Sequence, residues 1–204
     1  GMNMSKSSNS IRFMTQLSLL IAVQVVMKII GLGMVPVGPL KMSFLTVPIA
    51  VGAIVLGPAA GAILGGVFGI ISFYDALSGA SVMTSTFLSI SPVHTVILCI
   101  GMRVLMGFLT GIIYQALEKA MKSNARYVLG ALCAPVLNTI LFMGYICIVF
   151  YNTDYIQTLV TSLKVTNPFM FVIVLVGMQG LAEAVACAIV GGAVAKGVDV
   201  VVKK

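Results

Sequence analysis

Residues 42–77, MSFLTVPIAVGAIVLGPAAGAILGGVFGIISFYDAL, decide the class of this protein. A single charged residue, Asp75, interrupts their apolar character, and Gly57 followed by Pro58 divides the segment into two runs. Proline suits the first turn of a helix, so a second helix can begin where the first one breaks. The segment therefore predicts two consecutive membrane-spanning helices, 42–56 and 57–77, with a tight turn between them.

The rest of the chain has the same character. Of its 204 residues, 60% are hydrophobic and only 8% are charged, whereas about a quarter of the residues of a soluble domain are charged. A spanning helix takes ~20 apolar residues. The length therefore allows roughly five to seven spans and leaves no room for a sizeable soluble domain or a fused ATPase. We expect an integral membrane protein.

Apolar runs predict six membrane-spanning helices, at 13–32, 42–56, 57–77, 92–117, 127–150 and 168–195. The expected fold is an all-α bundle of these six helices, 13–195, between an N-terminal tail, 1–12, and a basic C-terminal tail, 196–204. The first run is too long for the apolar core of a signal peptide and has no small-residue cleavage site after it, so we expect it to be retained. Gly1 before Met2 resembles a residue left by cloning.

The basic residues predict the orientation of the bundle. Six spans place both termini on one side, where eight basic residues lie, against three toward the other side. The eight are Lys6, Arg12, Lys119, Lys122, Arg126, Lys196, Lys203 and Lys204, and the three are Lys28, Lys41 and Lys164. Because basic residues concentrate in cytoplasmic segments, we expect cytoplasmic termini. The connections 33–41, 78–91 and 151–166 then face outward and can cap a ligand pocket. The net charge of +7 is a topology signal and not a sign of nucleic-acid binding.

The sequence has no pattern typical of an enzyme. The fragment 191–196, GGAVAK, lacks the G-K-[ST] ending that binds nucleotide phosphates and magnesium. His94 is the only histidine, which excludes metal sites built on paired histidines. No G-x-S-x-G element is present. Four single cysteines, Cys99, Cys133, Cys147 and Cys187, lie in separate apolar runs and are expected to be packing residues. We therefore expect neither catalysis, nor a cofactor, nor a metal.

Two charged residues, Arg103 and Glu183, fall deep within the predicted spans. An unpaired arginine costs ~2.5–3.5 kcal/mol at the centre of a spanning helix. Arg103 must therefore face a partner, a water-filled cavity or a ligand, and an ion pair with Glu183 is one of the alternatives. Asn138 can bond a neighbouring helix or a ligand. Gln179 lies one turn before Glu183 and shares its helix face.

Two further features have structural and functional alternatives. Lys28 and Asp75 lie at the outer ends of two spans, where they can pair or reach toward the membrane surface. Gly57, Gly61, Gly65 and Gly69 recur every four residues and line one helix face. Such a face permits close helix packing, either within the bundle or against a partner membrane protein.

Three motifs resemble the substrate-binding S components of energy-coupling factor (ECF) vitamin transporters. They are V-P-I at 47–49, L-G-P-x-x-G at 56–61 and G-V-F-G-x-x-S-F at 66–73. The layout of the whole chain is also similar to this family. The chain looks most like the pantothenate-specific branch, because Arg103 begins R-V-L-M-G at 103–107 and Asn138 lies in L-N-T at 137–139.

The resemblance implies a protein of the bacterial plasma membrane that binds a vitamin from outside and needs no cofactor. Its implied partners are one transmembrane T component and two cytoplasmic ATPase subunits. Family members contact the T component through an A-x-x-x-A motif in their first helix, and the matching residues here are Ser18 and Ala22. The riboflavin branch carries an acidic residue in a motif that here reads LKMSF, at 40–44, and this absence argues against riboflavin.

The expected site uses Arg103 for the carboxylate of pantothenate, Asn138 for its amide or hydroxyl groups, and Glu183 to orient Arg103 or to bind a hydroxyl. Gln179 lies beside Glu183, and His94 or Tyr74 is expected to close the site. Another vitamin or precursor, such as riboflavin or a pyridoxine- or thiazole-like compound, remains an alternative. So do a self-sufficient transporter or channel in which Arg103 and Glu183 handle ions, and a structural protein that binds only other helices.

Overall fold

The computed structural model describes residues 2–37 and 40–202. In chain order its elements are α1 (Met2–Ile29), β1 (Met34–Val37), β2 (Leu40–Ser43), α2 (Thr46–Leu56), α3 (Pro58–Ser78), α4 (Val82–Ile90), α5 (Pro92–Val96), η1 (Ile97–Gly101), α6 (Met102–Ala120), α7 (Ala125–Tyr145), η2 (Ile146–Phe150), α8 (Asp154–Ser162), α9 (Pro168–Ala186), η3 (Cys187–Gly191) and α10 (Gly192–Val202). The three η elements are short π-helical stretches inside longer helices. The expectations for Gly1, Lys203 and Lys204 concern residues outside the described ranges.

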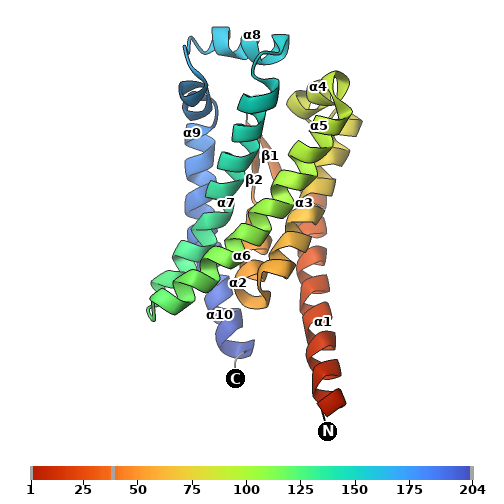
Figure 1. Ribbon diagram of the computed structural model, residues 1–204, viewed down its shortest axis with the longest axis vertical. Helices are drawn as coiled ribbons and strands as arrows, with labels where there is room; N and C mark the ends of the chain where they lie inside the picture. Colours follow the sequence, from red (N-terminus) through yellow and green to blue (C-terminus); the bar gives the residue numbers. More distant parts are fainter. Residues whose placement is uncertain (1, 38–39, 203–204) are drawn as a thin grey trace.

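Within the residues that the structure describes, five helical segments are long and apolar enough to cross a membrane. They are Ser7–Ile29, Pro58–Ser78, Pro92–Ala120, Ala125–Phe150 and Pro168–Val202. They run side by side along the long axis of the molecule (Figure 1). The prediction of an all-α bundle with several spanning helices is confirmed, apart from one short β-hairpin.

The second predicted span, 42–56, takes another form. Its helix, α2, has only 11 residues, or ~17 Å of length, about half of the ~30 Å hydrocarbon core. The residues before it pair in an antiparallel hairpin, in which Ser43 lies opposite Met34. Only Met42 and Ser43 of the predicted span belong to this hairpin, and its other residues lie in the predicted connection 33–41. β2 and α2 together make the return path between α1 and α3.

Both polar connections expected to be outward loops contain a short helix. The connection 78–91 forms α4, and the connection 151–166 forms α8. Both lie at the upper end of the bundle in Figure 1, whereas the start of α1 and the end of α10 lie at the lower end. The two ends of the described chain thus share one end of the bundle.

Three glycines of α3 pack directly against the helix formed by η1 and α6. A Cβ added to Gly61, Gly65 or Gly69 would overlap the backbone carbonyl of Gly107, Arg103 or Cys99, respectively. We call these six residues the glycine seam. Gly61, Gly65 and Gly69 therefore serve helix packing inside the bundle. This is one of the two alternatives that the sequence leaves open for the glycine row.

We predict that Gly65→Ala destabilises the protein by about 1–3 kcal/mol, because the new methyl group must push two backbones apart. Gly66→Ala is the matched control, since its Cβ would meet only the Val104 side chain at 3.4 Å, and alanine favours the helix. Thermal unfolding in detergent compares the two variants. Equal unfolding temperatures would contradict the close approach at the seam.

Two hydrophobic clusters divide the interior. The first joins α2, α3, α6 and α7 through side chains such as Leu45, Ile49 and Phe68. The second lies at the end of the bundle that carries α4 and α8, and it includes Phe87 and Phe142. Phe68 of the first cluster and Phe142 of the second line the same cavity. The cavity therefore lies at the boundary between the two clusters.

Candidate functional site

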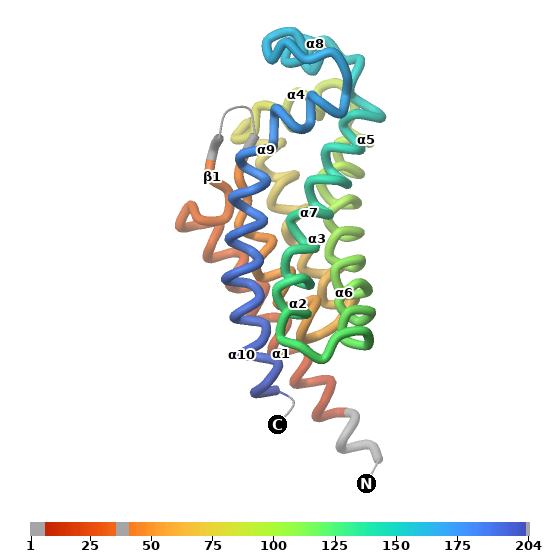
Figure 2. Tube along the Cα trace, turned by 90° about the vertical axis from the view of Figure 1, so that its left-hand side faces the viewer, coloured from red at the N-terminus to blue at the C-terminus, as the bar shows by residue number. Residues whose placement is uncertain are grey.

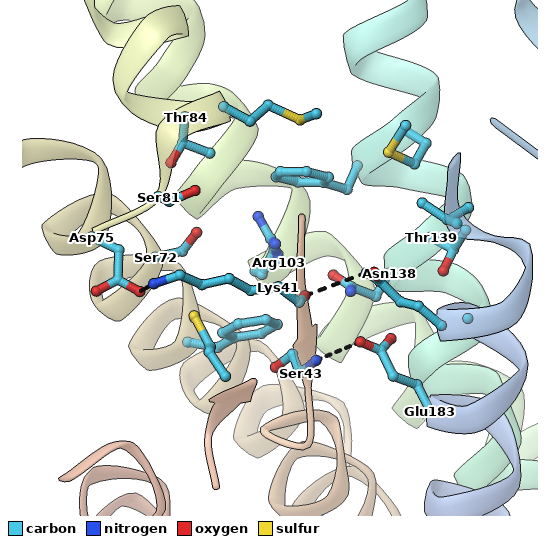
Figure 3. Close-up of a pocket in the computed structure, with 18 residues that line it drawn as sticks. Lys41, Ser43, Ser72, Asp75, Ser81, Thr84, Arg103, Asn138, Thr139 and Glu183 are labelled. Carbon is cyan, nitrogen blue, oxygen red and sulfur yellow. Dashed lines mark hydrogen bonds and ion pairs between the residues drawn. The ribbon is translucent and has the colours of Figure 1, made fainter. Parts of the chain in front are cut away.

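A cavity of about 70 Å³ lies between α3, α4, α6, α7 and α9, beside the hairpin (Figure 3). By the same measure one water molecule needs ~10–15 Å³, so the space holds several waters or one small molecule. Its polar lining residues are Lys41, Ser43, Ser72, Asp75, Ser81, Thr84, Arg103, Asn138, Thr139, Gln179 and Glu183. Five helices and a strand therefore supply polar groups to one space.

Arg103 is the central cation of the cavity, and its residue is only 6% exposed. Its Cζ lies 3.9 Å from the ring centroid of Phe142 and 4.7 Å from that of Phe68. Its Nη1 donates a long hydrogen bond of 3.5 Å to the Leu98 carbonyl, and its Nε has no partner among the described residues. Arg103 is thus buried with most of its donor capacity unused.

Arg103 and Glu183 form no ion pair in the described part of the chain, where the salt bridges involve Asp75. Glu183 instead accepts a hydrogen bond of 2.5 Å from the backbone N–H of Ser43 in β2. The direct ion pair between Arg103 and Glu183 is therefore not formed, although both side chains line the same cavity. The hydrogen-bond donors of the guanidinium stay available to another anion.

α9 also holds β2 through Gln179, whose Nε2 donates to the Lys41 carbonyl at 3.4 Å. Figure 3 shows both attachments as dashed lines, with β2 between α9 and the residues of α3. Figure 2, turned by 90°, shows β1 beside α9 in the half of the bundle nearer to α4 and α8. The hairpin thus forms one wall of the cavity.

Asp75 joins two lysines on the opposite side of β2. Lys28 Nζ lies 2.7 Å from its carboxylate and Lys41 Nζ lies 3.2 Å from it. The pairing of Lys28 with Asp75, one of the alternatives from the sequence, is confirmed, and Lys41 is an additional partner. Asp75 is only 2% exposed, so this carboxylate fastens both α1 and β2 to α3.

Two further polar atoms of the cavity are buried without a hydrogen-bond partner in the described residues. They are Oδ1 of Asn138 and Oγ1 of Thr84. A buried polar atom left unpaired costs about 1–3 kcal/mol. Oδ1 of Asn138 can accept a hydrogen bond, Oγ1 of Thr84 can donate or accept one, and Nε of Arg103 can donate one. All three atoms are therefore available to a bound polar molecule.

The structure gathers four of the six residues predicted for the site, Arg103, Asn138, Gln179 and Glu183. The other two do not line the cavity. Tyr74 points outward from α3 and is 65% exposed, and His94 lies at the far end of the bundle, where its Nδ1 is 2.6 Å from the hydroxyl of Tyr145. Neither side chain closes the site in this conformation.

Sequence reasoning missed several lining residues: Lys41, Ser43, Phe68, Thr84, Thr139 and Phe142. Lys41 carried a signal, because a lysine beside a predicted span needs an anionic or aqueous neighbour. Phe68 and Phe142 carried no such signal, because phenylalanine is a common residue in membrane-spanning helices and does not by itself indicate a site.

The site has the chemistry of binding. Two basic residues, Lys41 and Arg103, and two acidic ones, Asp75 and Glu183, line the cavity, and of the two basic residues only Lys41 forms a salt bridge among the described residues. No group of three metal-ligating side chains forms in the described chain. A buried arginine without an ion pair among the described residues, beside several hydrogen-bonding groups, suits a small molecule that carries an anionic group.

The comparison with protein families gives one match. A model described as "ECF transporter, substrate-specific component" matches residues 12–193. This range includes the cavity and the three motifs at 47–49, 56–61 and 66–73. A search of curated proteins gives no match.

Proposed function

Because the chain belongs to the family of ECF transporter substrate-specific components, we propose that it captures a small water-soluble vitamin bearing a carboxylate, with pantothenate as the first candidate. Membership makes it the substrate-binding part of a multi-pass membrane transporter and not an enzyme. The observation that carries the proposal is the buried guanidinium of Arg103, which has no carboxylate partner among the described residues.

Pantothenate matches the cavity group by group. Its carboxylate pairs with Arg103, whose planar fork suits two carboxylate oxygens. Its amide N–H and hydroxyls can donate to Oδ1 of Asn138 and to Glu183, and Thr84 offers a hydroxyl.

Riboflavin suits the site less well. As a neutral molecule it offers no carboxylate to the unpaired guanidinium of Arg103. Pyridoxine- and thiazole-like compounds also lack a carboxylate. The unpaired guanidinium thus favours pantothenate over these compounds.

The proposed partners are one T component and two cytoplasmic ATPase subunits of a bacterial plasma membrane. α1 offers the surface for the T component, because Ser18 and Ala22 are exposed on it. α1 packs against the rest of the bundle through other residues, which include the buried Leu17 and Gln24. The basic residues near the ends of α1, α6 and α10 favour a cytoplasmic location for both termini.

Calorimetric titration of the purified protein with a vitamin panel tests the proposed substrate. We expect saturable binding of pantothenate and no binding of riboflavin or pyridoxine. A yellow purified protein would reveal a bound flavin and contradict the proposal. Uptake into vesicles that contain no ATPase would contradict the proposed dependence on partners.

We predict that the double variant Ser18→Leu, Ala22→Leu keeps its affinity for pantothenate but lowers uptake with the partner subunits by roughly tenfold or more, because leucines block close approach of a second helix. Val23→Leu, on another exposed side of α1, is the control and should transport normally. Normal uptake by the double variant would place the docking surface elsewhere.

A further inference from the structure

We propose that Phe68 and Phe142 determine the specificity of the site by positioning Arg103, so that the cavity selects a carboxylate over a neutral molecule of the same shape. The inference rests on the proposed function, because it concerns how that substrate is recognised. It assigns to two apolar residues a role that neither their sequence context nor the family match implies.

The two rings enclose the guanidinium from different helices. Both centroids lie within 4.7 Å of Cζ of Arg103, well inside the ~6 Å range of a cation–π contact. Phe68 belongs to α3 and Phe142 to α7, and the two rings make no ring contact with each other among the described residues. The guanidinium of α6 therefore lies between the two rings.

This arrangement stabilises the charge without using its donors. An aromatic face attracts a cation through its quadrupole, whereas the hydrogen-bond donors of a guanidinium lie along its planar edge. A carboxylate in place of either ring would neutralise Arg103 and occupy that edge. With two rings, Nε stays unpaired and Nη1 has only the 3.5 Å bond to Leu98, so the edge remains available to a ligand.

The rings also keep Arg103 from an internal competitor. Glu183 lines the same cavity and would pair with a guanidinium that was free to rotate toward it. Loss of one ring would permit that rotation, and the ion pair would then fill the donors that a substrate carboxylate needs. A site with Arg103 already paired would lose its preference for a charged ligand.

The test compares two ligands with one skeleton, pantothenate and panthenol, in which an alcohol replaces the carboxylate. We expect Phe142→Met to lower the ratio of their affinities by roughly tenfold. Phe142→Tyr, which keeps an aromatic face, should retain most of the ratio. Phe171→Met is the matched control, because Phe171 is fully buried in α9 but does not line the cavity; it should lower stability and leave the ratio unchanged.

Equal loss of affinity for both ligands in Phe142→Met would show a purely structural role and overturn the proposal. Phe68→Met provides the same test from the other ring if Phe142→Met does not fold. If the wild type binds another carboxylate vitamin, pantothenate fails as substrate, and the ratio is measured for that vitamin and its amide. A wild type that binds only neutral vitamins would overturn both proposals.

Discussion

Arg103→Ala should weaken pantothenate binding by ~2–5 kcal/mol, or roughly 30-fold to several thousand-fold, because it removes one partner of a buried charge pair. The same change should stabilise the empty protein. Arg103 is buried with an unpaired Nε, and a buried cation without an ionic partner is costly in a membrane. Opposite effects on binding and stability distinguish a binding residue from a structural one.

Calorimetry and thermal unfolding without ligand measure the two effects. Arg103→Lys is the informative companion, because lysine keeps the charge but lacks the planar fork that binds two carboxylate oxygens. We expect it to recover only part of the lost affinity. Unchanged affinity in Arg103→Ala would refute the role of this residue, and a large loss of stability would show that the guanidinium serves the fold.

Asp75→Asn should lower the free energy of unfolding by ~2 kcal/mol and speed the release of ligand. The change leaves Lys28 and Lys41 without their carboxylate. Breaking a fully buried ion pair costs ~3–5 kcal/mol, but both lysine side chains are partly exposed and can reach water. Because Asp75 fastens β2 as well as α1, the wall of the cavity should loosen along with the first helix.

Unfolding in detergent and ligand dissociation measured by stopped flow check this second expectation. Asp154→Asn is the control, since Asp154 is exposed at the start of α8 and asparagine is tolerated at a helix start. Normal stability and normal dissociation in Asp75→Asn would mean that the two lysines find other partners at no cost.

Much of the architecture was predictable because the membrane imposes simple rules. Long apolar runs must be helical in lipid. For this reason the segments that contain Arg103 and Glu183 could be predicted as membrane-spanning helices. Polar residues within them must face the interior, and Asn138 and Gln179 both line the cavity. Local composition carries both signals.

The structure differs from the sequence-based expectations where contacts between residues far apart in the chain decide the local structure. The strand before α2 depends on its pairing with residues that follow α1, which an apolar run does not reveal. Tyr74, which together with His94 is a candidate to close the site from the outer side, does not line the cavity, because helical phase turns its side chain outward. The free state of Arg103 depends on a hydrogen bond between Glu183 and the Ser43 backbone, and no spacing in the sequence encodes that bond.

The glycine seam has a consequence for how substrate preference can diversify within such a protein. A Cβ added to Gly65 would overlap the backbone of Arg103, so α3 and α6 meet there without an intervening side chain, and a substitution at Gly65 would move the arginine that we propose as the carboxylate ligand. The facing wall has more room: a Cβ added to Gly180 of α9 would meet the Thr139 hydroxyl at 3.8 Å, an ordinary van der Waals distance. Substitutions in α9 can therefore change the shape of the cavity with less displacement of Arg103 than substitutions in α3.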